Sequence, residues 1–209
     1  MRRLLCYGDS NTYGVDPDTG LRFDESHRWP CVLARGLGPG WHVVEEGLCG
    51  RNSGLDDPVN PVRNGRTFLP VVLASHRPLD WVVVMLGSND FKSCFQQSAE
   101  AVAERVVGLA TYIASFDYGP YPAPRVLVVA PVRMERAALL TGKFDEESLC
   151  QNARFPETLR SRCRDACLPF LDASRTARAG SDGQHLDAHS HILLAQRLLP
   201  FLDTDDGAF

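Results

Sequence analysis

Five short apolar runs along the chain are separated by longer segments with helical spacing. The runs are residues 3–7, 41–46, 81–86, 125–130 and 168–171. The third run (WVVVML) and the fourth (RVLVVA) are almost continuously apolar and rich in β-branched residues, which is typical of strands buried on both faces of a sheet. The last run is the weakest. This alternation predicts an α/β fold, with helices on both faces of a parallel sheet of about five strands.

Between these runs, apolar residues recur at steps of three and four, which is the spacing of amphipathic helices. The clearest case is 99–116, and its apolar stripe consists of Ala99, Val102, Val106, Leu109, Ala110 and Ile113. Further helices are expected over 29–37, 67–76, 149–166 and 187–202. The helix over 67–76 is expected to begin near Pro70, because proline is tolerated in a first helical turn.

Three segments lack a regular pattern. The stretch GPYPAP, with prolines at 120, 122 and 124, predicts a loop that returns the chain to the fourth strand. Residues 134–144 have no clear partner and are expected to form a flap over a binding site. The tail 203–209 is expected to fray. A chain of 209 residues without an internal repeat predicts a single domain over 1–209.

Charge and composition limit the classes of partner. A net charge of -4 offers no basic stripe, which argues against nucleic acid and anionic membranes as partners. The apolar stretch near the N-terminus is shorter than a secretory signal needs, and no run approaches a membrane span. Seven scattered cysteines without paired CxxC units do not favour a zinc site or a full disulfide framework. A cytoplasmic protein is therefore expected, with no metal or organic cofactor.

A serine directly follows the first predicted strand, in the sequence Gly8-Asp9-Ser10-Asn11. Because ligands of open α/β sheets bind beyond the carboxyl ends of the strands, Ser10 is a candidate nucleophile. The alternative is that Ser10 caps a helix, since serine is a preferred N-cap residue. A phosphate-binding loop fits poorly, because neither GxGxxG nor GK[ST] is present.

One of the six histidines has a carboxylate at a suggestive spacing. Asp182 precedes His185 by three residues in a loop before the last predicted helix, where a carboxylate can orient an imidazole that serves as a base. The alternative is that Asp182 is a turn residue and His185 an incidental neighbour. His189 and His191 are expected to be packing or surface residues, and His42 is expected at the rim of the core.

Two loops after predicted strands offer hydrogen-bond donors for a developing oxyanion. Asn89 lies in GSND after the third strand, and its side-chain amide can donate. Gly50 lies in GLCGR after the second strand, where a backbone N–H can approach a substrate closely. Each loop taken alone is equally compatible with an ordinary turn.

Taken together, these four blocks resemble the SGNH hydrolases, also called the GDSL esterase/lipase family. The blocks are GDS at 8–10, Gly50 in GLCGR, GSND at 87–90 and DGQH at 182–185, and they span nearly the whole domain. The segments EEGLCGR and GSNDFK look most like the arylesterase or acyltransferase-type branch. The first block departs from GDSL at Asn11, a position that we interpret as having no chemical role.

The resemblance implies a three-layer α/β/α, flavodoxin-like fold that carries a catalytic triad. Ser10 would be the nucleophile, His185 the general base and acid, and Asp182 its orienting partner. The backbone N–H of Ser10, together with Gly50 and Asn89, would form the oxyanion hole. Asp9 is expected to fix the loop. Tyr13 and Val15 stand where pocket-lining aromatic residues can occur in the arylesterase branch, so the resemblance does not carry over a substrate preference.

The expected function is a serine esterase that acts on small to medium carboxylic esters, with aryl and acetyl esters favoured. Carbohydrate deacetylation, lysophospholipid hydrolysis and thioester hydrolysis use the same triad and remain open, as does acyl transfer. Alternatives of other classes are a non-catalytic small-molecule binding module and a flavodoxin-like nucleotide binder. Cys49 is a rival nucleophile. Phe91, Phe95 and Phe144 are surface candidates for a pocket, a lid or the interface of a homo-oligomer.

Overall fold

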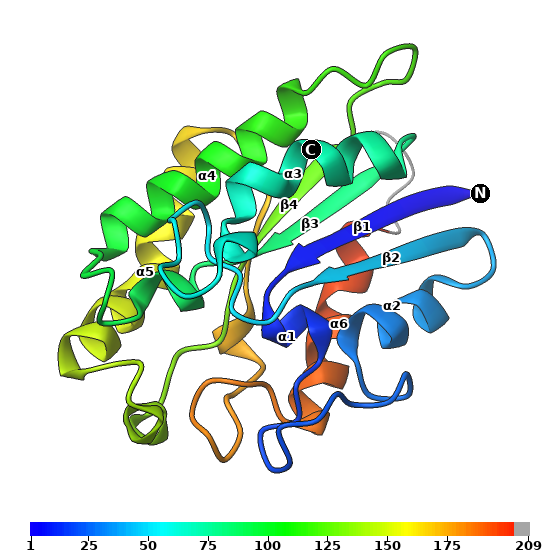
Figure 1. Cartoon of the computed structure of the whole chain (residues 1–209). Coiled ribbons are helices and arrows are strands. Elements are labelled where there is room, and N and C mark those ends of the chain that lie inside the picture. The colour runs from blue at the N-terminus through cyan, green and yellow to red at the C-terminus, as the bar shows by residue number, and fades with distance from the viewer. Residues whose placement is uncertain (203–209) are drawn as a thin grey trace.

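A computed structural model describes residues 1–202 and contains one parallel sheet with the strand order β2-β1-β3-β4-β5 (Figure 1). The strands are β1 (Arg2–Gly8), β2 (Trp41–Gly47), β3 (Trp81–Met85), β4 (Arg125–Ala130) and β5 (Phe170–Asp172). Because β2 lies on one side of β1 and the later strands on the other, the order reverses between β1 and β3. This is the flavodoxin-like order, and it confirms the predicted fold class.

Helices cover both faces of the sheet. They are α1 (Ser10–Tyr13), α2 (Trp29–Leu37), α3 (Gly65–His76), α4 (Ala99–Ser115), α5 (Glu146–Asp165) and α6 (Ala188–Leu202). Figure 1 shows α3, α4 and α5 on one side of the sheet and α2 and α6 on the other. Within residues 1–202, none of these helices combines the length and apolar character needed to cross a membrane.

The apolar runs are continuous because both faces of the sheet are buried. Leu5 and Tyr7 of β1 belong to the core beneath α3, α4 and α5, whereas Leu4 and Cys6 belong to the core beneath α2 and α6. Alternate residues of a strand point to opposite faces, so a strand covered on both faces needs apolar residues at every position. All four side chains are fully buried.

Some element boundaries differ from those predicted. The last strand begins at Phe170 instead of residue 168, because the Leu168 N–H donates to Cys163 O at 2.8 Å and closes the turn after α5. The α3 helix begins at Gly65, where Asn64 Oδ1 accepts hydrogen bonds from two N–H groups of the first turn. Pro70 is therefore the sixth helical residue and does not lie in the first turn.

The α5 helix begins three residues earlier than predicted because Asp145 and Ser148 form a reciprocal cap. Asp145 Oδ1 accepts from the Ser148 N–H at 2.8 Å, and Ser148 Oγ accepts from the Asp145 N–H at 3.2 Å. The last predicted helix begins one residue later, at Ala188. The predicted tail 203–209 lies outside the described residues.

The segment 134–144, expected to be an unpartnered flap, is packed against its neighbours. It contains a 3-10 helix (Arg136–Thr141) with Ala138 fully buried. The Glu135 N–H donates to Gly183 O at 2.8 Å, which joins this segment to the loop before α6. The segment thus supports that loop.

Two of the aromatic residues expected at the surface are in the interior. Phe91 is 2% exposed and meets the ring of Phe155 edge to face, with ring centroids 5.3 Å apart. Phe144 is also buried, and Phe95 is half-buried. The burial of Phe91 and Phe144 excludes them as surface lid or interface residues. His42, expected at the core rim, is exposed on the edge strand β2.

Candidate active site

The predicted site residues meet at the carboxyl ends of the strands, where the strand order reverses. Ser10 follows β1, Gly50 lies in the loop after β2, and Asn89 lies in the 3-10 helix (Ser88–Phe91) that follows β3. Asp182 and His185 come from the loop between β5 and α6. Figure 1 shows α1 at the end of β1, next to the end of β2. This is the position at which open α/β sheets bind ligands.

Ser10 is the first residue of α1, and the residue that caps this short helix is Asp9. Asp9 Oδ1 accepts a hydrogen bond from the Asn11 N–H at 2.9 Å, as an N-cap carboxylate does. The alternative interpretation of Ser10 as the capping residue was therefore wrong. Its hydroxyl is left available for another partner.

A continuous chain of hydrogen bonds joins Ser10, His185 and Asp182. Ser10 Oγ lies 2.8 Å from His185 Nε2, and His185 Nδ1 lies 2.5 Å from Asp182 Oδ2. The other carboxylate oxygen, Asp182 Oδ1, accepts from the N–H groups of Gln184 and His185 at 3.0 and 2.9 Å. Asp182 is thus both a turn residue and the partner of the imidazole. The fold brings together two sequence blocks that are 175 residues apart.

The hydrogen bonds to Asp182 favour its ionised form. Burial acts to raise the pKa of Asp182, but the His185 imidazole and the two backbone N–H groups outweigh burial and hold the pKa below its usual range. An ionised carboxylate keeps the Nδ1 proton of the imidazole on its side and leaves Nε2 free to accept a proton from Ser10. Within residues 1–202, no group of three His, Cys, Asp or Glu side chains is arranged to hold a metal ion.

Asn11 and Gly183 hold the His185 loop against α1. Asn11 Nδ2 donates to Gln184 O at 3.2 Å, and Asn11 Oδ1 accepts from the Leu186 N–H at 2.8 Å. Gly183 has a φ of +73°, and a Cβ there would lie 2.6 Å from the backbone nitrogen of Ala138. The position therefore requires glycine.

The proposed oxyanion donors surround the serine. Within residues 1–202, the N–H groups of Ser10 and Gly50 donate no hydrogen bond, so both are available to a substrate. Gly50 has a φ of +82°, and a Cβ there would lie 2.6 Å from Arg63 Nε. Asn89 Nδ2 donates to Asp9 Oδ2 at 3.3 Å and to Arg51 O at 3.2 Å. Both distances are at the long end for N–H···O hydrogen bonds, so these contacts are weak.

Asp9 is buried beside this group of donors. Burial raises the pKa of Asp9 from 3.8 to about 6, even though the Asn11 N–H and the nearby His185 and Arg51 favour the charged form. Asp9 accepts hydrogen bonds from both the serine turn and the Asn89 amide. The sequence-based expectation that it fixes the loop agrees with these contacts.

Ser10 and His185 line a pocket of about 280 Å³. Its lining residues are Ser10, Val15, Gly20, Cys49, Gly50, Arg63, Asn89, Lys92, Lys143, Gln184 and His185. Val15 lines the pocket as expected, whereas Tyr13 packs beneath the Arg22 guanidinium, 4.3 Å from the ring centroid. The sequence analysis did not identify the three cationic residues as site residues, although Lys92 ends the segment GSNDFK and Lys143 lies in the segment 134–144 that was expected to cover a binding site.

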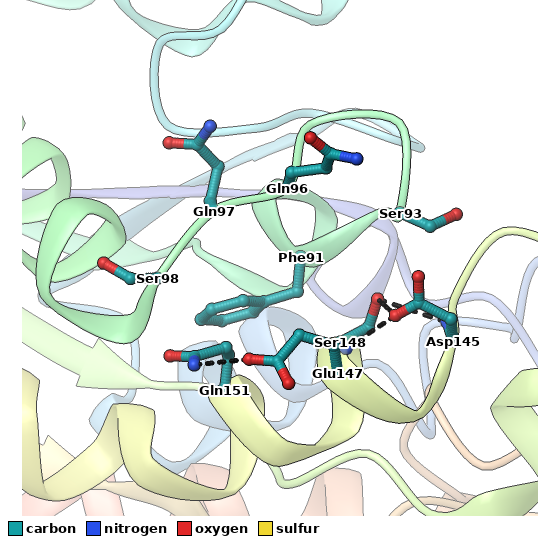
Figure 2. A pocket seen from close by; sticks show the side chains of 9 residues that line it. All are labelled: Phe91, Ser93, Gln96, Gln97, Ser98, Asp145, Glu147, Ser148 and Gln151. Atoms are coloured by element: carbon teal, nitrogen blue, oxygen red, sulfur yellow. Dashed lines mark hydrogen bonds between the residues drawn. The ribbon is translucent and has the colours of Figure 1, made fainter.

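Another hollow of about 330 Å³ lies between the segment 93–98 and the start of α5, with the buried Phe91 at its base (Figure 2). Four of its polar side chains are paired with one another: Gln151 donates to Glu147 at 2.7 Å, and Ser148 donates to Asp145 at 2.8 Å. No histidine or cation lines this hollow in the described part of the chain. It lacks the base that a hydroxyl nucleophile requires.

Comparisons with known proteins show the family to which the chain belongs. Residues 6–192 match the model of the GDSL-like lipase/acylhydrolase family. An inhibitor-bound aryl esterase from M. smegmatis is 33% identical, over 97% of this chain and 98% of that chain, with a TM-score of 0.90. A putative arylesterase from Agrobacterium tumefaciens is 37% identical, with the same coverage and a TM-score of 0.88.

A carbohydrate acetylesterase from Sinorhizobium meliloti is also similar, with 35% identity over 97% of this chain and 98% of that chain and a TM-score of 0.89. A comparison with curated proteins found no match. The family match covers residues 6–192. The three esterase structures named above align with 97% of this chain and with 98% of their own chains. The chain therefore belongs to the GDSL-like lipase/acylhydrolase family and is an esterase of that family.

Proposed function

We propose that the protein is a serine esterase that cleaves small carboxylic esters through an acyl-enzyme on Ser10. The observation that carries the proposal is the hydrogen-bond chain from Ser10 Oγ through His185 to Asp182. A hydroxyl is a weak nucleophile unless a base lies beside it, and an imidazole oriented by a carboxylate is such a base.

In the acylation step, His185 Nε2 accepts the proton of the Ser10 hydroxyl while Oγ bonds to the carbonyl carbon of the ester. The carbonyl oxygen becomes an oxyanion, which accepts hydrogen bonds from the N–H groups of Ser10 and Gly50. Asn89 joins them when its amide exchanges one of its two long contacts for the oxyanion. The intermediate then collapses, the C–O bond to the alcohol breaks, and His185 donates its proton to the departing oxygen.

Deacylation repeats these steps with water as the nucleophile. Water transfers a proton to His185 Nε2 and bonds to the acyl carbon. Collapse of the second intermediate breaks the bond to Oγ, and His185 returns the proton to Ser10. The products are a carboxylic acid and an alcohol, and the enzyme is restored.

The size and lining of the pocket favour small acyl groups. A volume of about 280 Å³ lies at the lower end of ligand pockets, which span ~300–1,000 Å³. Val15 is the one aliphatic side chain among the described lining residues, so a long acyl chain would gain little by burial there. The similar structures named as aryl esterases and as a carbohydrate acetylesterase make aryl and acetyl esters the first substrates to test.

Cys49 is a weaker candidate for the nucleophile, although it lines the same pocket. Burial, followed by the charge of Asp9, raises the pKa of the Cys49 thiol, which keeps it protonated near neutral pH. Within residues 1–202, no histidine ring forms a hydrogen bond with Cys49. The intact triad also disfavours a role as a binding module without catalysis.

The test is hydrolysis of p-nitrophenyl esters from acetate to decanoate by the wild type and Ser10→Ala, with EDTA present. We expect wild-type activity to be highest on short acyl chains and to fall by at least about a thousandfold in Ser10→Ala, as losses of triad residues do. Activity that persists in the folded variant would exclude Ser10 as the nucleophile. Circular dichroism of both proteins provides the control for folding.

A further inference from the structure

The active-site pocket is lined by cations although the protein as a whole is acidic. Arg63, Lys92 and Lys143 line it, and no Asp or Glu does so in the described part of the chain. The whole sequence contains two lysines, and both are in this group. The net charge of the chain is -4, so an overall excess of positive charge does not account for three cations around one pocket. Their convergence is a property of this site.

One carboxylate forms ion pairs with two of these cations. Asp57 Oδ2 lies 3.2 Å from an Arg63 guanidinium nitrogen and 3.3 Å from Lys92 Nζ. Burial acts to raise the pKa of Asp57, but the N–H groups of Val59 and Asn60, together with Lys92, hold it at about 2. Asp57 is thus a single fixed negative charge, and two positive charges share it.

The third cation, Lys143, is not paired within residues 1–202. Lys143 is exposed, and its side chain forms no ion pair with a described residue. Arg63 Nε is buried and has no hydrogen-bond partner among the described residues, although it lies beside Gly50. A buried donor without a partner is costly, so an acceptor supplied by a ligand would satisfy it.

A second cavity of about 410 Å³ adjoins the active-site pocket. Arg63, Lys92 and Lys143 line both spaces, and Pro58 and Val59 add an apolar wall to the second. A substrate whose carbonyl lies at Ser10 can therefore extend past the three cations into this cavity. Its far part would meet positive charge, a small apolar surface and the Asp57 carboxylate, which is itself paired with Arg63 and Lys92.

We infer that the preferred substrates of this esterase carry a negative charge, such as a carboxylate, which binds among Arg63, Lys92 and Lys143. This inference rests on the proposed function, because it assigns the substrate class of the same site. Lys143 is the specificity-determining residue in this arrangement, since its charge is exposed and has no fixed partner. Arg63 and Lys92 form the preorganised part, since Asp57 holds both.

The test compares anionic and neutral esters that otherwise match. The first pair is 4-acetoxybenzoate and methyl 4-acetoxybenzoate, which place the charge on the alcohol side. The second is mono-4-nitrophenyl adipate and its methyl ester, which place it on the acyl side. The readout is the ratio of kcat/KM for the anionic ester to that for the neutral ester, so intrinsic differences in ester reactivity cancel between enzyme variants.

In at least one pair we expect Lys143→Gln to lower this ratio about tenfold and Lys143→Glu to lower it further, because a charge contact inside a cleft is only partly screened. Raising the salt from low to high concentration should lower the wild-type ratio but change that of Lys143→Gln less. The matched control is Arg136→Gln, which changes net charge equally but removes an exposed cation paired with Glu146, and its ratio should equal that of the wild type.

Equal ratios for the wild type and both Lys143 variants in both pairs would overturn the inference. Hydrolysis of the neutral esters by the wild type, lost in Ser10→Ala, reports separately on the proposed function. The two failures are therefore distinguishable: the charge preference can be absent while the serine chemistry stands.

Discussion

At the scale of single residues, the site depends on side chains with two partners each. Asp182 uses one oxygen for backbone N–H groups and the other for His185. Asn11 similarly donates to one backbone group of the His185 loop and accepts from another. Because each residue closes two contacts, the proposed reacting atoms, Ser10 Oγ and His185 Nε2, are held at hydrogen-bond distance. Such preorganisation lowers the cost of reaching the transition state.

Asp9 is predicted to cost stability at neutral pH. Its folded pKa is raised from 3.8 to about 6, so the cost of burying its charge is absent below about pH 4 and fully present above about pH 6. Asp9→Asn should therefore stabilise the protein relative to the wild type by up to about 3 kcal/mol more at pH 7.5 than at pH 4.

Urea unfolding of both proteins at the two pH values measures this difference. Any constant cost of an altered hydrogen bond cancels, because the readout is the change of the stability difference with pH. A stability difference that is the same at pH 7.5 and pH 4 would show that Asp9 titrates normally in the folded protein.

At the scale of elements, the strands were more predictable than the starts of the helices. Each strand is covered on both faces, so its apolar run is visible in the sequence, and β3 and β4 were placed within one residue. The starts of α3 and α5 were misplaced because a single polar cap, Asn64 or Asp145, extends each helix beyond its apolar pattern. The three-residue spacing of Asp145 and Ser148 is visible in the sequence and could have predicted the cap of α5.

Asn11, interpreted from the sequence as having no chemical role, joins α1 to the loop that carries His185. Asn11→Leu should lower kcat about ten- to a hundredfold, because a small displacement of a catalytic group has a large effect on rate. It should also lower stability by about 1–3 kcal/mol, since the buried Leu186 N–H loses its acceptor. Steady-state kinetics and urea unfolding measure the two effects.

The control for this prediction is Ser98→Ala, which removes a capping hydrogen bond of α4. That variant should lose about 1 kcal/mol of stability and keep its kcat. If Asn11→Leu loses stability but retains wild-type kcat, its contacts support the fold and do not position His185.

At the scale of the whole molecule, strand order explains both what the sequence indicated and what it concealed. The reversal between β1 and β3 brings the ends of strands together, so a serine after one strand and an asparagine after another were recognisable site candidates. Arg63, Lys92 and Lys143 lie in long loops, whose paths depend on packing with distant segments. No local pattern marks those residues as neighbours.

The central claim is that Ser10 forms the covalent intermediate, and covalent labelling followed by peptide mass mapping tests it most directly. The protein would be treated with a fluorophosphonate at neutral pH as wild type, Ser10→Ala and Cys49→Ala. We predict one phosphonyl adduct on the peptide containing Ser10 in the wild type and in Cys49→Ala, and none in Ser10→Ala. An adduct on another residue, or wild-type hydrolysis of esters without any labelling of Ser10, would contradict the account.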